Sequence, residues 1–178
     1  MKRTILFIIV ITGLWSCIGA QDPESRLKEK GIVLTAPASP IANYVNAVRV
    51  GNLLFLAGKG PQKADNTYIT GKLGKDLTIE QGYEAARLTA INHLAVIRAE
   101  LGSLNNVKRI VKVLGMVNST DTFTDQPKVI NGYSDLMVEI FGEKGKHARS
   151  AVGMASLPLN MAVEVEVIVE IEDQTKTK

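Results

Sequence analysis

His147-Ala-Arg-Ser-Ala-Val-Gly-Met-Ala-Ser-Leu-Pro-Leu-Asn-Met-Ala-Val-Glu-Val-Glu166 is the stretch that decides the fold. It predicts a small apolar strand over Ser150–Ala155 and a second strand over Val163–Glu172, joined by a turn that contains Pro158. In the second strand apolar and acidic side chains alternate, and a period of two residues is typical of a half-buried strand. One face then carries Val163, Val165, Val167, Val169 and Ile171, and the other carries Glu164, Glu166, Glu170 and Glu172.

Two charged residues open these strands, Arg149 the first and Glu164 the second. A guanidinium among small side chains can bind a planar carboxylate through two parallel hydrogen bonds. The alternative is an Arg149–Glu164 ion pair on the surface, which would contribute little to stability. Taken alone, the stretch favours the surface pair, since such pairs are common.

The rest of the chain supplies three more strands and two helices. Gly51-Asn52 is a tight turn between two strands, and a capping box of Thr78 and Gln81 begins a helix that ends before Gly102. The expected strands span Tyr44–Val50, Leu53–Ala57 and Val107–Val117, and the expected helices span Ile79–Leu101 and Gln126–Phe141. This order, β-β-α-β-α-β-β, predicts an α+β fold in which one sheet has both helices on one face.

Residues 1–20 have the pattern of an export signal, with Lys2 and Arg3 before an apolar run. Three interpretations stay open: cleavage after Ala20, lipidation of Cys17 at a lipobox-like sequence, or a retained membrane anchor. All three place the domain outside the cytoplasm, so we expect a periplasmic, secreted or lipid-anchored protein that contacts a membrane only through a lipid on Cys17. The expected divisions are a signal peptide over 1–20, a tether or short helix over 21–30, one domain over 31–172 and a polar tail over 173–178.

Composition excludes several classes of protein. The 178 residues are 46% hydrophobic and 22% charged, which is typical of a single globular domain. Without Lys2 and Arg3 the chain has 19 basic and 18 acidic residues, and no basic patch has interleaved aromatics, so we expect no nucleic-acid partner. His93 has no Cys, Asp or His at ligand spacing, so we interpret it as structural and expect no metal site.

The run Ala-Arg-Ser-Ala-Val, followed by Leu-Pro and Val-Glu-Val-Glu, resembles the C-terminal signature of the RidA/YjgF family, also called endoribonuclease L-PSP. Ala36-Pro37-Ala38, Tyr44 and Val50–Gly58 resemble the N-terminal segment of the family, so the resemblance covers nearly all of Gly31–Glu172. It implies a chorismate-mutase-like fold and a homotrimer with clefts between its subunits. It also implies an enamine/imine deaminase of the 2-iminobutanoate/2-iminopropanoate type, which forms 2-keto acids and ammonia without a metal or an organic cofactor.

The resemblance also implies roles for individual residues. Arg149 matches the arginine that binds the substrate carboxylate, and Glu164 matches the glutamate that positions or activates water. Tyr44, Gly58 and Asn131 match pocket residues, Asn131 across a helix that is about one turn longer than in the family.

Two departures from the pattern remove polar groups from this pocket. Ala151 stands where active deaminases carry Cys or Thr, and Ala57 stands where they carry Ser. With its longer second helix and its loop over 62–74, the chain resembles a longer, divergent branch of the family, and it carries a signal peptide in addition.

Three functions are therefore expected from the sequence. The first is an enamine/imine deaminase of the envelope, and the second is a trimer that binds a small carboxylate-bearing molecule without hydrolysing it. The third is a chaperone-like interaction trimer with vestigial clefts. A ribonuclease ranks below these, because His93 and His147 have no evident reason to meet and no basic groove is present.

Overall fold

The computed structural model describes residues 21–37 and 42–172. The expected signal peptide, the lipidation site Cys17 and the polar tail lie outside the described residues. Within them, no helix is both long and apolar enough to cross a membrane.

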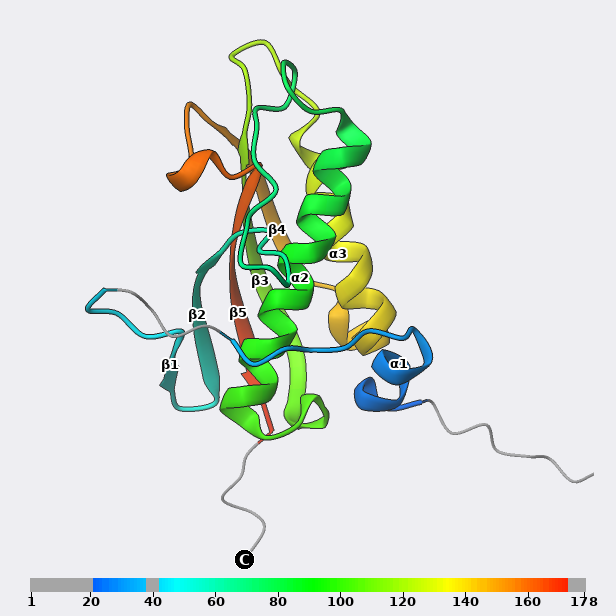
Figure 1. The fold of residues 1–178 in the computed structure, drawn as a ribbon. Helices are drawn as coiled ribbons and strands as arrows, with labels where there is room; N and C mark the ends of the chain where they lie inside the picture. The colour runs from blue at the N-terminus through cyan, green and yellow to red at the C-terminus, as the bar shows by residue number, and fades with distance from the viewer. Residues whose placement is uncertain (1–20, 38–41, 173–178) are drawn as a thin grey trace, which may run out of the picture.

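One mixed sheet of five strands forms the centre of the molecule (Figure 1). The strands are β1 (Ala47–Val50), β2 (Leu53–Lys59), β3 (Val107–Asn118), β4 (Ala148–Met154) and β5 (Val163–Ile171). Their order is β1-β2-β5-β3-β4; β4 is parallel to β3, and the other neighbours are antiparallel. Helices α2 (Ile79–Leu101) and α3 (Gln126–Phe141) lie side by side on one face, which confirms the predicted α+β architecture.

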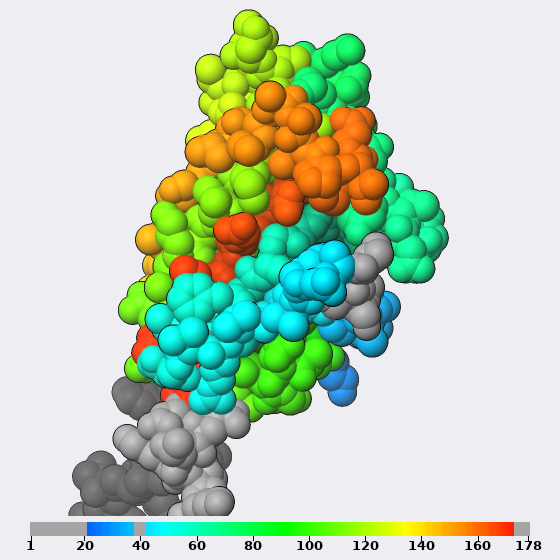
Figure 2. Space-filling model, turned by 90° about the vertical axis from the view of Figure 1, so that its left-hand side faces the viewer, coloured from blue at the N-terminus to red at the C-terminus, as the bar shows by residue number. Residues whose placement is uncertain are grey.

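Strand β5 has the predicted alternation. Its five inward side chains are at most 1% exposed and pack in the core beneath α2 and α3: Val163, Val165, Val167, Val169 and Ile171. Its glutamates and Ile168 point to the opposite face, which no element of this chain covers. Figure 2 looks onto this open face, where β5 is visible between β3 and β2. Burial of this apolar inner face stabilises the two-layer arrangement by about 25 cal/mol per Å² of apolar surface.

Both long helices have the predicted boundaries because their end signals are local. The Thr78 hydroxyl accepts from the Gln81 N–H, the Gln81 side chain accepts from the Thr78 N–H, and Gly102 ends α2 with a left-handed φ of 76°. In α3, Pro127 occupies the first turn and Gly142 follows the last residue. Short 3₁₀ turns complete the chain at Leu104–Asn106, Gly142–Gly145 and Pro158–Asn160.

The segment expected to be a tether or a short helix forms helix α1 (Pro23–Glu29). The helix is packed against the domain, since Leu27 is 2% exposed and Glu24 pairs with Arg98 of α2. The Glu24 carboxylate also accepts from the backbone N–H of Leu104 at 2.9 Å. The packed region therefore begins at Pro23 rather than at Gly31.

Some strand boundaries differ from the sequence-based expectation. Strand β1 begins at Ala47 rather than at Tyr44, and β2 continues to Lys59 through an irregularity between Leu56 and Lys59. Strand β4 begins at Ala148 and ends at Met154, because each of its residues pairs with β3 from Lys112 to Asn118. These ends are set by the partner strands and not by local residue preference.

Candidate functional site

The Arg149 side chain extends from the edge strand β4 toward α3. Its Nη1 donates to Asn131 Oδ1 at 2.9 Å and to Ser134 Oγ at 3.0 Å. Its Nη2 lies 3.5 Å from the carbonyl oxygen of Pro127. Arg149 and Glu164 do not pair within the chain, so the surface ion pair favoured by the sequence alone is wrong.

These contacts leave one edge of the guanidinium available. Nη1 uses both of its hydrogens, whereas Nε has no hydrogen-bond partner among the described residues and Nη2 has only the long contact to Pro127. The Nε–H and Nη2–H groups point in parallel, which is the geometry that binds a carboxylate side-on. Because β4 is an edge strand, an anion can approach Arg149 from outside the sheet.

Ser134 and His147 support Arg149, and the sequence did not predict this role for either. The Ser134 hydroxyl lies 3.0 Å from His147 Nε2, and His147 Nδ1 lies 2.7 Å from the Gly145 carbonyl oxygen. Since that carbonyl can only accept, Nδ1 carries the proton and Nε2 accepts from Ser134. Burial lowers the pKa of His147, and the nearby Arg149 charge lowers it further against the opposing Gly145 bond. A neutral imidazole therefore orients the hydroxyl that holds the guanidinium.

Glu164 lies on the open face of β5 and contacts Gly58 of β2. A Cβ built on Gly58 would lie 2.3 Å from Glu164 Oε1, so the carboxylate occupies space that any other residue at 58 would fill. Burial raises the pKa of the Glu164 carboxyl, and the nearby Glu166 carboxylate raises it further. A carboxyl with a raised pKa is suited to proton transfer nearer neutral pH.

The structure thus groups the predicted site residues in two sets. Arg149 meets Asn131, and Ala151, two residues along β4, packs against the core on the same face. Gly58 meets Glu164 on the opposite face.

The sixth predicted residue lies apart from both sets. Tyr44 is 55% exposed and precedes β1, at the other edge of the sheet from β4. Four strand spacings of about 4.8 Å separate those edges. One chain therefore presents two half-sites on different faces and does not assemble the predicted pocket.

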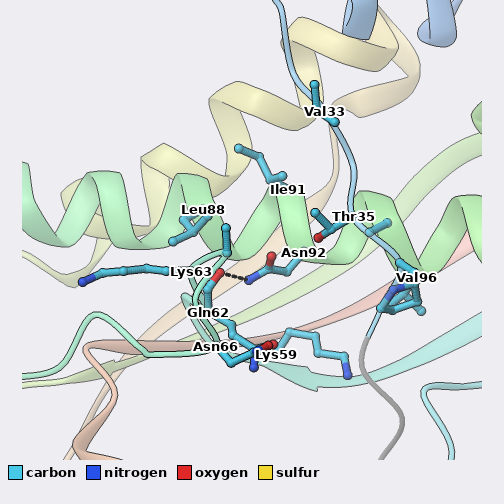
Figure 3. Close-up of a pocket in the computed structure, with 14 residues that line it drawn as sticks. Val33, Thr35, Lys59, Gln62, Lys63, Asn66, Leu88, Ile91, Asn92 and Val96 are labelled. Carbon is cyan, nitrogen blue, oxygen red and sulfur yellow. Dashed lines mark hydrogen bonds between the residues drawn. The ribbon is translucent and has the colours of Figure 1, made fainter.

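Two hollows lie near these elements. One, of about 330 Å³, is on the open face between Phe55, Lys112, Leu114 and Glu166. The other, of about 240 Å³, lies between α2 and the segments 33–37 and 59–66, and none of the predicted site residues lines it (Figure 3). There the Asn92 amide donates to the carbonyls of Gly60 and Gln62, so it braces the loop.

No group of three or more His, Cys, Asp or Glu side chains among the described residues could hold a metal ion. His93 is fully buried, and protein groups bond both of its ring nitrogens. This agrees with its interpretation as a structural residue.

Comparison with known proteins gives a consistent picture. A family model described as "YjgF/chorismate_mutase-like, putative endoribonuclease" matches residues 24–171. Protein TCP17 of Trypanosoma cruzi is 44% identical over 89% of this chain and 99% of its own length. A 2-iminobutanoate/2-iminopropanoate deaminase of Dermatophagoides farinae is 34% identical over 82% of this chain and 100% of its own.

Solved structures show the same fold. Protein Atu1372 of Agrobacterium tumefaciens has a TM-score of 0.79 and 44% identity, over 84% of this chain and 92% of its own. E. coli TdcF, solved with bound serine, has a TM-score of 0.53 and 28% identity, over 77% of this chain and 94% of its own. The fold expected from the sequence, chorismate-mutase-like, is thereby confirmed.

Proposed function

Because this chain belongs to the YjgF/chorismate-mutase-like family, which includes the RidA proteins, we propose that it is an enamine/imine deaminase. Its substrates are 2-imino acids and their enamine tautomers, and its products are 2-keto acids and ammonia. The main support is the Arg149 guanidinium, whose Nε and Nη2 edge is held ready for a carboxylate by Asn131 and Ser134. The deaminase relative and the serine bound by TdcF support the same substrate class, small molecules that carry a carboxylate and a nitrogen.

The reaction divides between two groups. Arg149 binds the carboxylate and thereby orients the imine. The oxygen of a water molecule forms a bond to the imine carbon while Glu164 accepts a proton from that water. That proton passes to the nitrogen and gives a carbinolamine. Glu164 then takes the hydroxyl proton and returns it to the nitrogen as the C–N bond breaks, the C=O bond forms and ammonia leaves. A Glu164 pKa that burial has raised favours both halves of this proton transfer.

One substrate can meet both groups only if they come from different copies of the chain, since Arg149 and Glu164 lie on opposite faces of the sheet. The open face exposes apolar side chains that a second copy would bury: Val48, Val50, Phe55, Val152 and Met154. We propose closure into a homotrimer with the sites between subunits. Light scattering should give the mass of three chains at micromolar concentration, and a stable monomer would contradict both the trimer and the shared site.

The test of the function compares four proteins: wild type, Arg149→Ala, Arg149→Lys and Glu164→Gln. Titration with a small keto acid should show weaker binding for both Arg149 variants, because lysine keeps the charge but lacks the planar fork. Each charge-assisted hydrogen bond contributes ~1.5–3 kcal/mol. Glu164→Gln should bind normally and release ammonia from a freshly generated imine more slowly. Equal affinities in all four proteins would refute the site.

A carboxylate-binding trimer without hydrolysis is the second candidate. It is favoured by Ala57 and Ala151, which place methyl groups where a deaminase pocket would have polar ones, and Ala151 packs against the core. Ligand-dependent thermal stabilisation without ammonia release would identify this function.

We also propose that the protein is exported from the cytoplasm, on the strength of the Lys2-Arg3 start and the apolar run. The mass of the mature N-terminus should correspond either to cleavage before Gln21 or to a lipidated Cys17. A cytoplasmic protein with Met1 intact would refute export.

A further inference from the structure

A buried chain of two hydrogen bonds links α3, α2 and β2. The Tyr133 hydroxyl lies 3.0 Å from His93 Nδ1, and His93 Nε2 lies 3.2 Å from the Ala57 carbonyl oxygen. Both rings are fully buried and meet edge-to-face, with 5.7 Å between their centroids. Since the Ala57 carbonyl can only accept, Nε2 carries the proton and Nδ1 accepts from Tyr133. Each polar side-chain atom of Tyr133 and His93 then has a hydrogen-bond partner.

The two ends of this chain lie beside the two half-sites. Tyr133 stands in α3 between Asn131 and Ser134, the two residues that hold Arg149. Ala57 directly precedes Gly58, against which the Glu164 carboxylate lies.

The Ala57 carbonyl occupies an irregular part of β2. Regular pairing of β2 with β5 stops at Leu56 and resumes at Lys59, so the ladder to β5 does not hold Ala57 and Gly58. The Ala57 N–H bonds to the Asn46 carbonyl on the β1 side. His93 supplies the hydrogen bond that fixes the Ala57 carbonyl from the core.

The buried polar pair does more than fill space. Apolar side chains of similar shape could replace the Tyr133–His93 bond at little cost in stability, but they would leave the Ala57 carbonyl oxygen without its core partner. A fully satisfied buried network instead makes its surroundings rigid and specifies one arrangement.

We infer that His93 and Tyr133 are positioning residues that hold Gly58 in the place that Glu164 requires and connect it, through the core of each subunit, to the helix that holds Arg149. This inference rests on the proposed function for its catalytic consequence. Its structural consequence, a change in the environment of the Glu164 carboxyl, does not depend on that function.

The test uses His93→Leu, Tyr133→Phe and His93→Gln, whose amide N–H can still reach the Ala57 carbonyl. Thr89→Val is the matched control, because Thr89 is fully buried one turn from His93 and its hydroxyl donates only to Ala85 of the same helix. The first readout is the ¹³C titration of the Glu164 carboxyl by NMR, assigned with Glu164→Gln. The second is the division of any loss in imine hydrolysis between kcat and KM.

The titration midpoint of Glu164 should fall toward its ordinary value in His93→Leu, because relaxation of the irregular segment at Ala57 and Gly58 admits water to the carboxyl. It should fall less in Tyr133→Phe and His93→Gln and stay unchanged in Thr89→Val. In His93→Leu, kcat should fall about tenfold or more, the scale of a misplaced group, while KM changes less than about twofold.

A Glu164 midpoint that moves no further in His93→Leu than in Thr89→Val would overturn the inference. If the midpoint moves as expected but the wild type releases no ammonia, the deaminase proposal fails and the positioning role stands. If ammonia release is normal in wild type and in His93→Leu alike, the positioning role fails and the deaminase proposal stands.

Discussion

Acidification should destabilise this protein through His93, and the structure gives the size of the effect. The imidazole is fully buried, and this burial lowers its pKa from 6.5 to about 4; the Ala57 bond opposes the shift and the Lys59 charge adds to it. The unfolded chain therefore binds one more proton than the folded chain between these two pH values. A shift of this size corresponds to ~3 kcal/mol of unfolding free energy.

The sign follows from the depressed pKa. The contribution of His93 is fully present above about pH 6.5 and is lost as the pH falls toward about 4, where the folded protein must protonate a buried ring. The groups that face the ring are Tyr133, whose pKa is raised by burial, and Lys59, whose pKa burial lowers. We expect Tyr133 to remain neutral and Lys59 charged throughout this range, so His93 is the member of the cluster that titrates.

The assay is urea unfolding at fixed protein concentration, at several pH values from 7 to 4, for wild type and His93→Gln. The variant removes the titrating group, so its loss of stability over this range should be smaller than that of wild type by ~3 kcal/mol. His147→Gln is the control for the second buried imidazole, whose pKa is also lowered. Parallel pH profiles for wild type and His93→Gln would refute the reasoning, whatever the stability of the variant at pH 7.

Three further predictions follow from single contacts. Gly58→Ala should displace the Glu164 carboxylate, since the new Cβ would lie 2.3 Å from Oε1, and a crystal structure of the variant with Glu164 unmoved would contradict this. Leu27→Ala should lower the free energy of unfolding by ~2–5 kcal/mol, because this 2% exposed side chain docks α1 on the domain; urea unfolding that shows no change would mean that α1 is a tether. Thr78→Ala should cost ~1 kcal/mol in the same assay and Thr78→Ser much less, because serine keeps the cap; equal losses would exclude the capping box as the cause.

The sequence by itself determined the elements whose signals are local. The capping box at Thr78, the left-handed Gly102 and the alternation along β5 each depend on residues within a few positions of one another. Helix α2, helix α3 and the buried face of β5 could therefore be predicted closely. The family signature was also readable, because it consists of short runs of neighbouring residues.

Only the tertiary structure decided where the charged groups of the site lie. Arg149 pairs with Val113 of β3 and Glu164 pairs with Met116 of the same strand, and this odd offset of three residues puts their side chains on opposite faces. The offset depends on how β4 and β5 are each registered against β3. The turn between β4 and β5 does not reveal these registers, because its length could not be read from the sequence. The predicted Arg149–Glu164 pair failed for this reason.

The partners of Arg149 and His93 were hidden from the sequence for a related reason. Asn131 and Ser134 are 18 and 15 residues from Arg149, and Ala57 is 36 residues from His93, so these contacts form only when helices and strands pack. Hydrogen bonds of this kind leave no periodic pattern along the chain. Local residue preference built the strands and helices, and packing between distant segments decided which of their side chains meet.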